Sequence, residues 1–219
     1  MPVKVLLVRQ DRLMFEGLVS ILADRPNLEV LGVASSASDA VEKAALLQPD
    51  VVVMDVGLSD SEGWQACEHI RRRLPDIAVL FLSADVSDDA MERAVAAGAA
   101  GYLSTEVSTD EVVEAIARLA EGELLVTAAA LGRLMRQGRE DAGPAAASVP
   151  LNDAERAVLT RMAAGLHNWE IAEQLGLQPS AVRGRVRSLL EKLGVHSRAQ
   201  AVDSARRAGL IGEAAGAAS

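Results

Sequence analysis

Three arginines occupy alternate positions of one short stretch of the chain, at Arg183, Arg185 and Arg187. Apolar residues recur around them at steps of three and four, which predicts a helix over residues 179–193 with one buried stripe. The opposite face and its flank carry the candidate DNA contacts, which are Ser180, Arg183, Gly184, Arg185, Arg187 and, near the end, Lys192. Guanidinium groups pair with guanine edges or hold phosphates, so the pattern favours a helix for the DNA major groove. A solvated basic helix face is the simpler alternative.

A second set of polar residues follows the apolar runs in the first half of the chain. Its members are Arg9, Gln10, Asp11, Asp55 and Ser83. In open α/β sheets the functional crevice lies at the carboxyl ends of the strands. We therefore expect this set, together with the stretch after Leu103, to share one edge of a sheet. A small ligand could enter the same crevice, although no motif identifies one.

The elements that position the second set alternate along residues 1–122. Apolar runs predict strands at 3–8, 28–33, 50–55, 77–82 and 99–103, and several are apolar throughout, as in strands buried on both faces of a parallel sheet. Helical spacing separates them at 11–24, 37–48, 61–73, 86–97 and 108–121, the last opening with a capping box from Ser108 to Glu111. Five repeats of strand and helix predict a doubly wound α/β domain with a five-stranded parallel sheet.

The rest of the chain divides into a linker and a small all-α domain. We expect residues 123–150 to hold a linker helix, starting at 123, and then a flexible linker with two prolines. Residues 151–212 predict four helices, with Asn152 capping the first, Asn168 the second and Ser197 the last. Two short helices around a glycine-containing turn form a helix-turn-helix pattern. Residues 213–219 are expected to be a disordered tail.

Charge is distributed unevenly between the two predicted domains. Residues 1–150 carry 13 basic and 24 acidic residues, a net charge of −11, whereas residues 151–212 carry 9 basic and 6 acidic residues, a net charge of +3. This asymmetry suggests that only the second domain meets a polyanion. Because Cys67 is the lone cysteine, we expect it to be an ordinary helix residue and the protein to be cytoplasmic. No apolar run approaches the length of a membrane span.

Residues 151–208 resemble the LuxR-type DNA-binding domain. The matching residues are Leu151, Glu155, Gly165, Leu166, Glu170, Ile171, Ala172, Val182, Arg183, Lys192, Leu193, Gly194, Val195, Ser197 and Arg198. The resemblance implies contacts with double-stranded DNA from Arg183, Gly184 and Arg187, and a homodimer formed through residues 197–207. Gln178 replaces the usual Ser or Thr cap, and Gly184 costs about 1 kcal/mol relative to Ala inside a helix. Trp169 stands where Lys is usual, and we interpret it as a packing residue rather than a DNA contact.

Residues 3–121 resemble the receiver domain of response regulators, and both domains together give the architecture of NarL/FixJ-type regulators. The matching segments are residues 5–8, 16–18, 49–55, 82–84 and 97–103, with Gly63, Ile70 and Arg71. The resemblance places Asp55 at the phosphoacceptor position. Receivers hold Mg²⁺ with an acidic pair after the first strand, where this chain has Arg9 and Gln10, and use a Lys where this chain has Thr105.

These departures predict a degenerate receiver. Asp55 and Ser83 remain, but Arg9 brings a positive charge to the metal position and Asp11 aligns one residue late. Without the metal and the Lys, a transferred phosphoryl group lacks its main stabilisers. We therefore expect Mg²⁺ binding to be lost or weak and phosphotransfer to Asp55 to be absent or very slow. The simpler role for Asp55 is to accept hydrogen bonds or to pair with Arg9.

The leading hypothesis is a dimeric transcription regulator that acts without phosphorylation. One alternative is a conventional regulator phosphorylated on Asp55. Another is an interaction protein that forms heterodimers with a second regulator and does not bind DNA, against which the three arginines argue. An enzyme is the weakest alternative, because Asp55 alone suggests aspartyl-phosphate chemistry and no other catalytic constellation, cofactor motif or metal-ligand spacing accompanies it.

Overall fold

The amino-terminal domain contains a five-stranded parallel sheet. A computed structural model describes residues 2–9, 15–55, 60–126, 151–195 and 197–211. The strands are β1 (Val3–Val8), β2 (Leu28–Ala34), β3 (Val51–Asp55), β4 (Ala78–Ser83) and β5 (Gly101–Ser104), in the order β2-β1-β3-β4-β5. All neighbouring pairs are parallel, which confirms the predicted sheet. The bounds predicted for the strands differ from the observed ones by no more than two residues.

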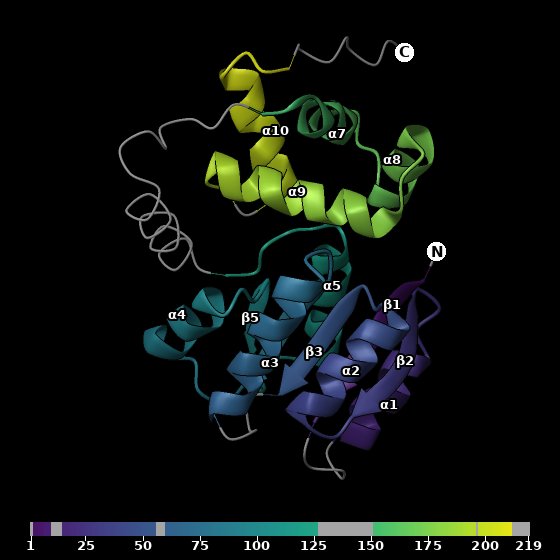
Figure 1. Ribbon diagram of the computed structural model, residues 1–219, viewed down its shortest axis with the longest axis vertical. Coiled ribbons are helices and arrows are strands. Elements are labelled where there is room, and N and C mark those ends of the chain that lie inside the picture. The colour runs from purple at the N-terminus through teal and green to yellow at the C-terminus, as the bar shows by residue number, and fades with distance from the viewer. Residues whose placement is uncertain (1, 10–14, 56–59, 127–150, 196, 212–219) are drawn as a thin grey trace.

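Helices cover both faces of this sheet (Figure 1). They are α1 (Phe15–Ala23), α2 (Ala37–Leu47), α3 (Asp60–Arg73), α4 (Asp88–Ala96) and α5 (Thr109–Ala120). Alternate strand residues separate into two clusters, one packed with α1 and α5 and the other with α2, α3 and α4. Because both faces are covered, β3 is apolar from Val51 to Met54 and β4 from Ala78 to Leu82, as their sequences indicated. Among the described helices, none is long and apolar enough to cross a membrane.

The carboxy-terminal domain contains the four expected helices, α7 (Asp153–Ala163), α8 (Asn168–Leu175), α9 (Pro179–Leu193) and α10 (Arg198–Arg207). Capping boxes begin α5 and α7 as predicted, from Ser108 to Glu111 and from Asn152 to Glu155. The predicted cap of α8 is wrong by one residue. His167 is the N-cap and Asn168 is the first helical residue, because the Asn168 amide is used between the domains instead.

The predicted linker helix does not begin at 123. Leu125 extends alongside β5, donating its backbone N–H to the carbonyl of Ala100 and accepting a hydrogen bond from the N–H of Tyr102. Residues 123–126 therefore add an extended segment to the sheet edge. The rest of the predicted linker, 127–150, and the predicted tail, 213–219, lie outside the described residues, as does Gly212 at the end of the predicted helical domain.

The two domains pack end to end. Figure 1 shows α9 lying across the end of the sheet domain where β1 and β3 begin. This is the amino-terminal edge of the sheet, opposite to the carboxyl ends that carry Arg9 and Asp55. The fold thus separates the two predicted sites by the length of the strands.

Candidate nucleic-acid interface and receiver pocket

Local sequence explains the position of every side chain on α9. Pro179 occupies its first turn, where a missing N–H is no loss, and Gly194 ends it in the left-handed conformation. Of the predicted stripe, Val182, Val186, Leu189 and Leu190 are fully buried and Leu193 is partly buried. The arginine face must therefore point away from that core, as the sequence indicated.

The arginine face does not point into solvent, because the receiver-like domain covers it. Arg183 is only 4% exposed, and its Nη1 lies 2.8 Å from Oδ1 of Asp50, which directly precedes β3. Its Nε donates to the backbone carbonyl of Asp76 at 2.6 Å. A residue expected to contact DNA is thus held by acceptors of the other domain.

Arg187 is held in the same way, one turn further along α9. It is 7% exposed, its Nη2 donates to the carbonyl of Gly98 at 2.7 Å, and its Nε lies 3.2 Å from Oε1 of Glu191. Arg71 of α3 lies close by. Burial first, and then the charge of Arg187, lower the pKa of Arg71 to about 10. The interface therefore contains cation–cation repulsion as well as ion pairs.

Two glycines allow this close approach. A Cβ on Gly184 would overlap Oδ1 of Asp76 and lie 3.3 Å from its Cγ. On the other side, Gly122 follows α5 with φ +84°, and a Cβ there would lie 3.0 Å from the carbonyl oxygen of Arg183 and from Val186. The glycine that the sequence marked as a departure on α9 is thus accounted for by domain packing. Burial, the largest cause, raises the pKa of Asp76.

The remaining predicted DNA contacts have different surroundings. Ser180 lines a hollow between the domains, and Arg185 is half-buried beside Asp76. Lys192 donates to Oε1 of the buried Glu155 at 2.6 Å, so it joins α9 to α7 within its own domain. The structure thus brings Ser180, Arg183, Arg185 and Arg187 together at the domain boundary, and Lys192 lies apart from them.

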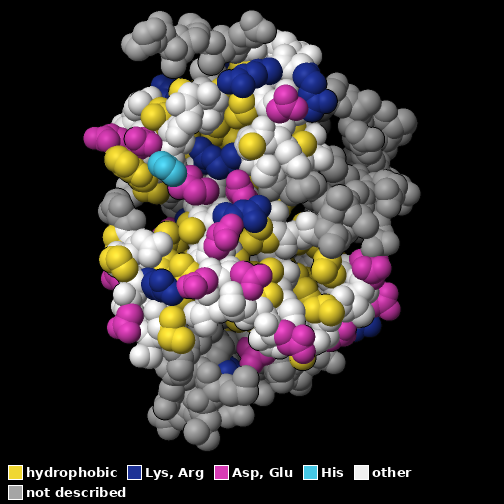
Figure 2. Space-filling model, turned by 180° about the vertical axis from the view of Figure 1, so that it is seen from behind, with side chains coloured by type: hydrophobic (Ala, Val, Ile, Leu, Met, Phe, Trp, Pro, Cys, Tyr) yellow, Lys and Arg dark blue, Asp and Glu magenta, His cyan; other side chains and the backbone are white. Residues whose placement is uncertain are grey.

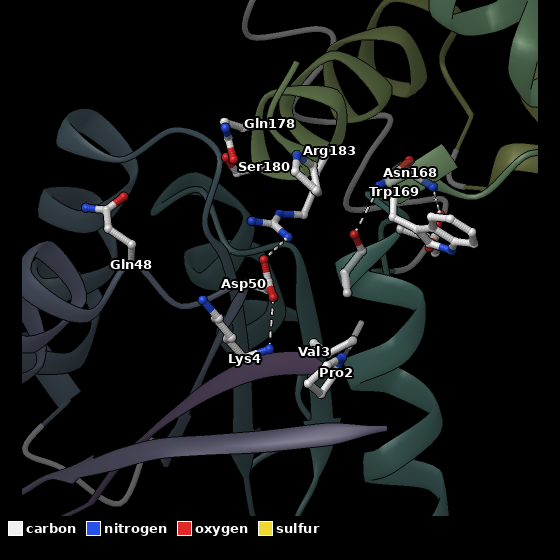
Figure 3. A pocket seen from close by; sticks show the side chains of 13 residues that line it. Pro2, Val3, Lys4, Gln48, Asp50, Asn168, Trp169, Gln178, Ser180 and Arg183 are labelled. Carbon is white, nitrogen blue, oxygen red and sulfur yellow. Dashed lines mark hydrogen bonds and ion pairs between the residues drawn. The ribbon is translucent and has the colours of Figure 1, made fainter. Parts of the chain in front are cut away.

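The hollow between the domains has a volume of about 400 Å³ and is lined by residues from both (Figure 3). Lys4, Gln48 and Asp50 come from the receiver-like domain, and Ser180, Arg183 and Trp169 from the helical one. Trp169, interpreted from the sequence as a packing residue, is 47% exposed and lines this hollow, so about half of its surface lies outside the core.

A second polar contact joins the domains, and no pattern in the sequence predicts it. Oε2 of Glu121, at the end of α5, accepts hydrogen bonds from the backbone N–H of Asn168 at 3.1 Å and from Nη1 of Arg198 at 3.1 Å. The amide of Asn168 donates to the carbonyl of Ala120. Figure 2 shows basic and acidic side chains next to one another at this level, between the upper and lower parts of the molecule.

At the opposite edge of the sheet, Asp55 is paired with Arg9. Nε of Arg9 lies 3.4 Å from Oδ2 of Asp55, and the two side chains are 11% and 20% exposed. Ser83 is buried, and its Oγ accepts a hydrogen bond from the N–H of Asp85. Thr105 is exposed and donates its N–H to the carbonyl of Ser83. Gln10 and Asp11 lie outside the described residues.

The described part of this pocket does not suit a divalent cation. Mg²⁺ requires several oxygen ligands, commonly carboxylates, whereas Asp55 faces a guanidinium group. Within the described residues, no group of three or more His, Cys, Asp or Glu side chains is arranged to hold a metal ion. Cys67 is buried in α3, and burial raises the pKa of its thiol to about 12, so it is not a nucleophile at neutral pH.

Comparison with known proteins gives matches over both domains. Residues 5–117 match the response regulator receiver domain, and residues 149–205 match the luxR family of bacterial regulatory proteins. The chain is 36% identical to the transcriptional activator DevR/DosR of Mycobacterium tuberculosis over 91% of this chain and 92% of that relative. It is 31% identical to the regulatory protein LiaR of Bacillus subtilis over 95% and 99%.

Solved structures match as well. The receiver domain of a putative NarL from Mycobacterium tuberculosis is 30% identical, with a TM-score of 0.52 over 55% of this chain and 98% of that one. A LuxR-family response regulator from Aurantimonas is 25% identical, with a TM-score of 0.55 over 63% and 99%.

Proposed function

The chain belongs to the LuxR family of DNA-binding transcriptional response regulators, and we propose that it exists in a closed form in which the receiver-like domain covers its DNA-reading surface. The observation that carries the proposal is the burial of Arg183 and Arg187 against acceptors of the receiver-like domain. A helix whose arginines are buried in this way cannot enter a major groove. Binding to DNA therefore requires the domains to separate.

In the open form, α9 reads DNA. Arg183, Gly184, Arg185 and Arg187 face the major groove, Ser180 contacts the backbone, and Lys192 stays with Glu155. The homodimer forms through α10, so that the operator is two-fold symmetric. This assignment is supported by the isolation of the arginine face from the helical core.

The switch between the two forms does not use phosphate. Arg9 already supplies Asp55 with a positive charge, and Thr105 supplies none where receivers use Lys. A phosphoryl group on Asp55 would have to displace Arg9 and would lack a metal ion to neutralise its oxygens. The receiver-like domain acts as a cover that DNA itself displaces and that a signal other than phosphate weakens.

A DNA selection on the full-length protein tests these statements together. Random duplexes are selected with untreated protein and with protein incubated with acetyl phosphate and Mg²⁺, and both pools are sequenced. We expect one two-fold-symmetric site, enriched equally in both. Enrichment only after treatment would show that Asp55 is phosphorylated, and no enrichment in either pool would favour the heterodimer alternative.

Variants of α9 test the DNA-reading residues on the selected site. Arg183→Ala and Arg187→Ala each weaken binding by about 1–3 kcal/mol where the side chain reads a base. Where it holds only a phosphate, the slope of log K against log salt falls by about one instead. Because Arg183→Ala also removes the ion pair with Asp50, it is combined with Asp50→Asn and compared with that variant alone. Arg187→Ala removes a hydrogen bond to the carbonyl of Gly98, which favours opening and tighter binding, so a loss of affinity in this variant still reports a DNA contact.

A further inference from the structure

Asn168, Arg198 and His167 form an anion-binding cradle at the start of α8. The backbone N–H of Asn168 and Nη1 of Arg198 both donate to Oε2 of Glu121, and Nδ1 of His167 lies 3.5 Å from the other carboxylate oxygen. The ligand that fills the cradle is thus a carboxylate, and it belongs to the other domain. Two hydrogen-bond donors directed at the same oxygen atom, with an imidazole nearby, are suited to binding an oxyanion.

The arginine of this cradle is fixed before any ligand arrives. Arg198 is 17% exposed, and it donates to the carbonyl of Leu166 at 2.6 Å and to Oδ1 of Asn168 at 2.7 Å, both within its own domain. Its Nη1 also donates to Oε2 of Glu121, and its backbone N–H donates to Oε1 of Glu123. Burial lowers the pKa of Arg198, whereas the charges of Glu121 and Glu123 oppose that shift. When the domains separate, this cation loses both counter-charges while its contacts with Leu166 and Asn168 hold it in place, and an anion from outside can take their position.

The cradle lies on the same side of the domain as the arginines of α9. One hollow between the domains is lined on one side by Asn168, Trp169, Ser180 and Arg183, and on the other by Glu121 and Asp50. Each of the two carboxylates accepts from an arginine of the helical domain. In a helix-turn-helix, the first helix crosses the DNA backbone while the second enters the groove, which puts the start of α8 beside a phosphate.

We propose that this cradle binds a backbone phosphate of DNA, and that Glu121 takes the place of that phosphate in the closed form. The inference rests on the proposed function, because it requires α9 to read DNA in the open form. It adds to that function a contact outside the recognition helix. It also gives the end of α5 a direct role, since DNA and Glu121 compete for the same donors.

Replacing the N-cap residue tests the cradle without disturbing the fold. His167→Asp places a carboxylate where it caps the N–H groups of α8 itself, so the helix is retained while the cradle is filled. His167→Asn caps the helix equally well without charge and is the matched control. In full-length protein on the selected DNA site, we expect His167→Asp to bind at least about tenfold more weakly than His167→Asn. The loss should be the same on unrelated DNA, because a phosphate carries no sequence information.

Two further variants separate the phosphate contact from structural effects. Glu121→Gln removes the competing carboxylate and should tighten DNA binding about three- to tenfold, whereas Glu114→Gln, the same charge change on α5, should not. Arg198→Gln should lower the salt slope by about one.

Equal binding by His167→Asp and His167→Asn, or an unchanged salt slope in an Arg198→Gln protein that unfolds at the wild-type temperature, would overturn the proposal. Wild-type protein that selects no DNA site would instead refute the proposed function itself.

Discussion

At the scale of single residues, the same chemistry serves two partners. A guanidinium group pairs equally well with a phosphate or with a carboxylate, and Arg183 has the carboxylate of Asp50 at 2.8 Å. The sequence therefore identifies which residues can bind an anion but not which anion they meet. The acidic partners Asp50, Asp76 and Glu121 carry no local signal, because each is one of many acidic residues in a domain with a large negative charge.

Asp50 offers the first test at this scale. Asp50→Asn removes the counter-charge of a buried arginine, and we expect it to weaken domain closure by about 1–2 kcal/mol. Apparent affinity for the selected DNA should then rise about 5- to 30-fold, since less of the protein is closed. Fluorescence anisotropy with labelled DNA measures the change. Asp39→Asn, which disrupts an ion pair with Lys43 inside the receiver-like domain, is the control. Equal affinity of Asp50→Asn and wild type would argue against the closed form.

Glu155 gives the helical domain a defined acid sensitivity. Burial, the largest single influence, raises its pKa, but hydrogen bonds from Lys192, the N–H of Asn152 and Ser188 together outweigh it and hold the pKa below the usual 4.5. A carboxyl group with a lowered pKa stabilises the fold above pH 4.5, and this stabilisation is lost as the pH falls through the folded-state value.

Glu155→Gln should therefore cost about 1–2 kcal/mol at pH 7 and remove part of the acid dependence. Amide hydrogen exchange of α7 and α9 between pH 7 and pH 3.5, corrected for the intrinsic rates, reports the stability of this domain. Glu114→Gln, on the exposed side of α5, provides the comparison. If Glu155→Gln keeps the full acid dependence of wild type, the carboxylate of Glu155 is not its source.

At the scale of elements, the sequence predicts most of what the structure contains. Neighbouring residues alone determine three of these features, which are the buried strands, the capping boxes and the apolar stripe on α9, so the sequence predicts them. The failures occur where distant residues compete. Asn168 gives up the predicted cap because its amide bonds to Ala120, 48 residues away, and residues 123–126 extend beside β5 because Leu125 pairs with Ala100 and Tyr102. No periodicity within either segment could reveal those partners.

The contact between α9 and the turn after α5 can be tested through glycine. Gly122→Ala would put a Cβ 3.0 Å from the carbonyl oxygen of Arg183, at a position with φ +84°. Gly165→Ala imposes the same backbone strain of about 1–2 kcal/mol, at φ +80°, with no atom within 4 Å. Only Gly122→Ala should therefore open the domains, which small-angle scattering would detect as a larger radius of gyration and anisotropy as tighter DNA binding. If both variants behave alike, strain rather than contact is responsible.

At the scale of the whole molecule, the closed form is a balance. Ion pairs at Asp50 and Glu121 favour closure, while the burial of Arg71 close to Arg187 opposes it. The free energy of closure is the difference between these opposing contributions, and a partner that prefers one form shifts the balance by the amount of its preference. Under the proposed function DNA has such a preference, because the arginines proposed to contact it are the ones that closure hides. By linkage, any signal that favours the open form strengthens DNA binding by the same factor.

A reversible cross-link tests this balance in one protein. A Cβ on Gly184 would lie 3.9 Å from Cα of Asp76 and 3.3 Å from its Cγ. Cysteines at the two positions should therefore bring their Cβ atoms close to the separation of about 3.5–4.5 Å found in disulfides, so Asp76→Cys combined with Gly184→Cys should form a bond across the interface on oxidation. Cys67 does not compete, since its buried thiol has a pKa of about 12. The oxidised protein should bind the selected DNA at least about tenfold more weakly than the same protein after reduction.

The reduced form controls for both substitutions, because only the bond differs between the two samples. Gel mobility under non-reducing conditions shows the fraction cross-linked within one chain. The loss of affinity on oxidation is then compared with the cross-linked fraction, because only cross-linked molecules are held closed. If fully cross-linked protein binds DNA as tightly as reduced protein, α9 does not have to leave the receiver-like domain, and the arginines buried against it are not the residues that read DNA.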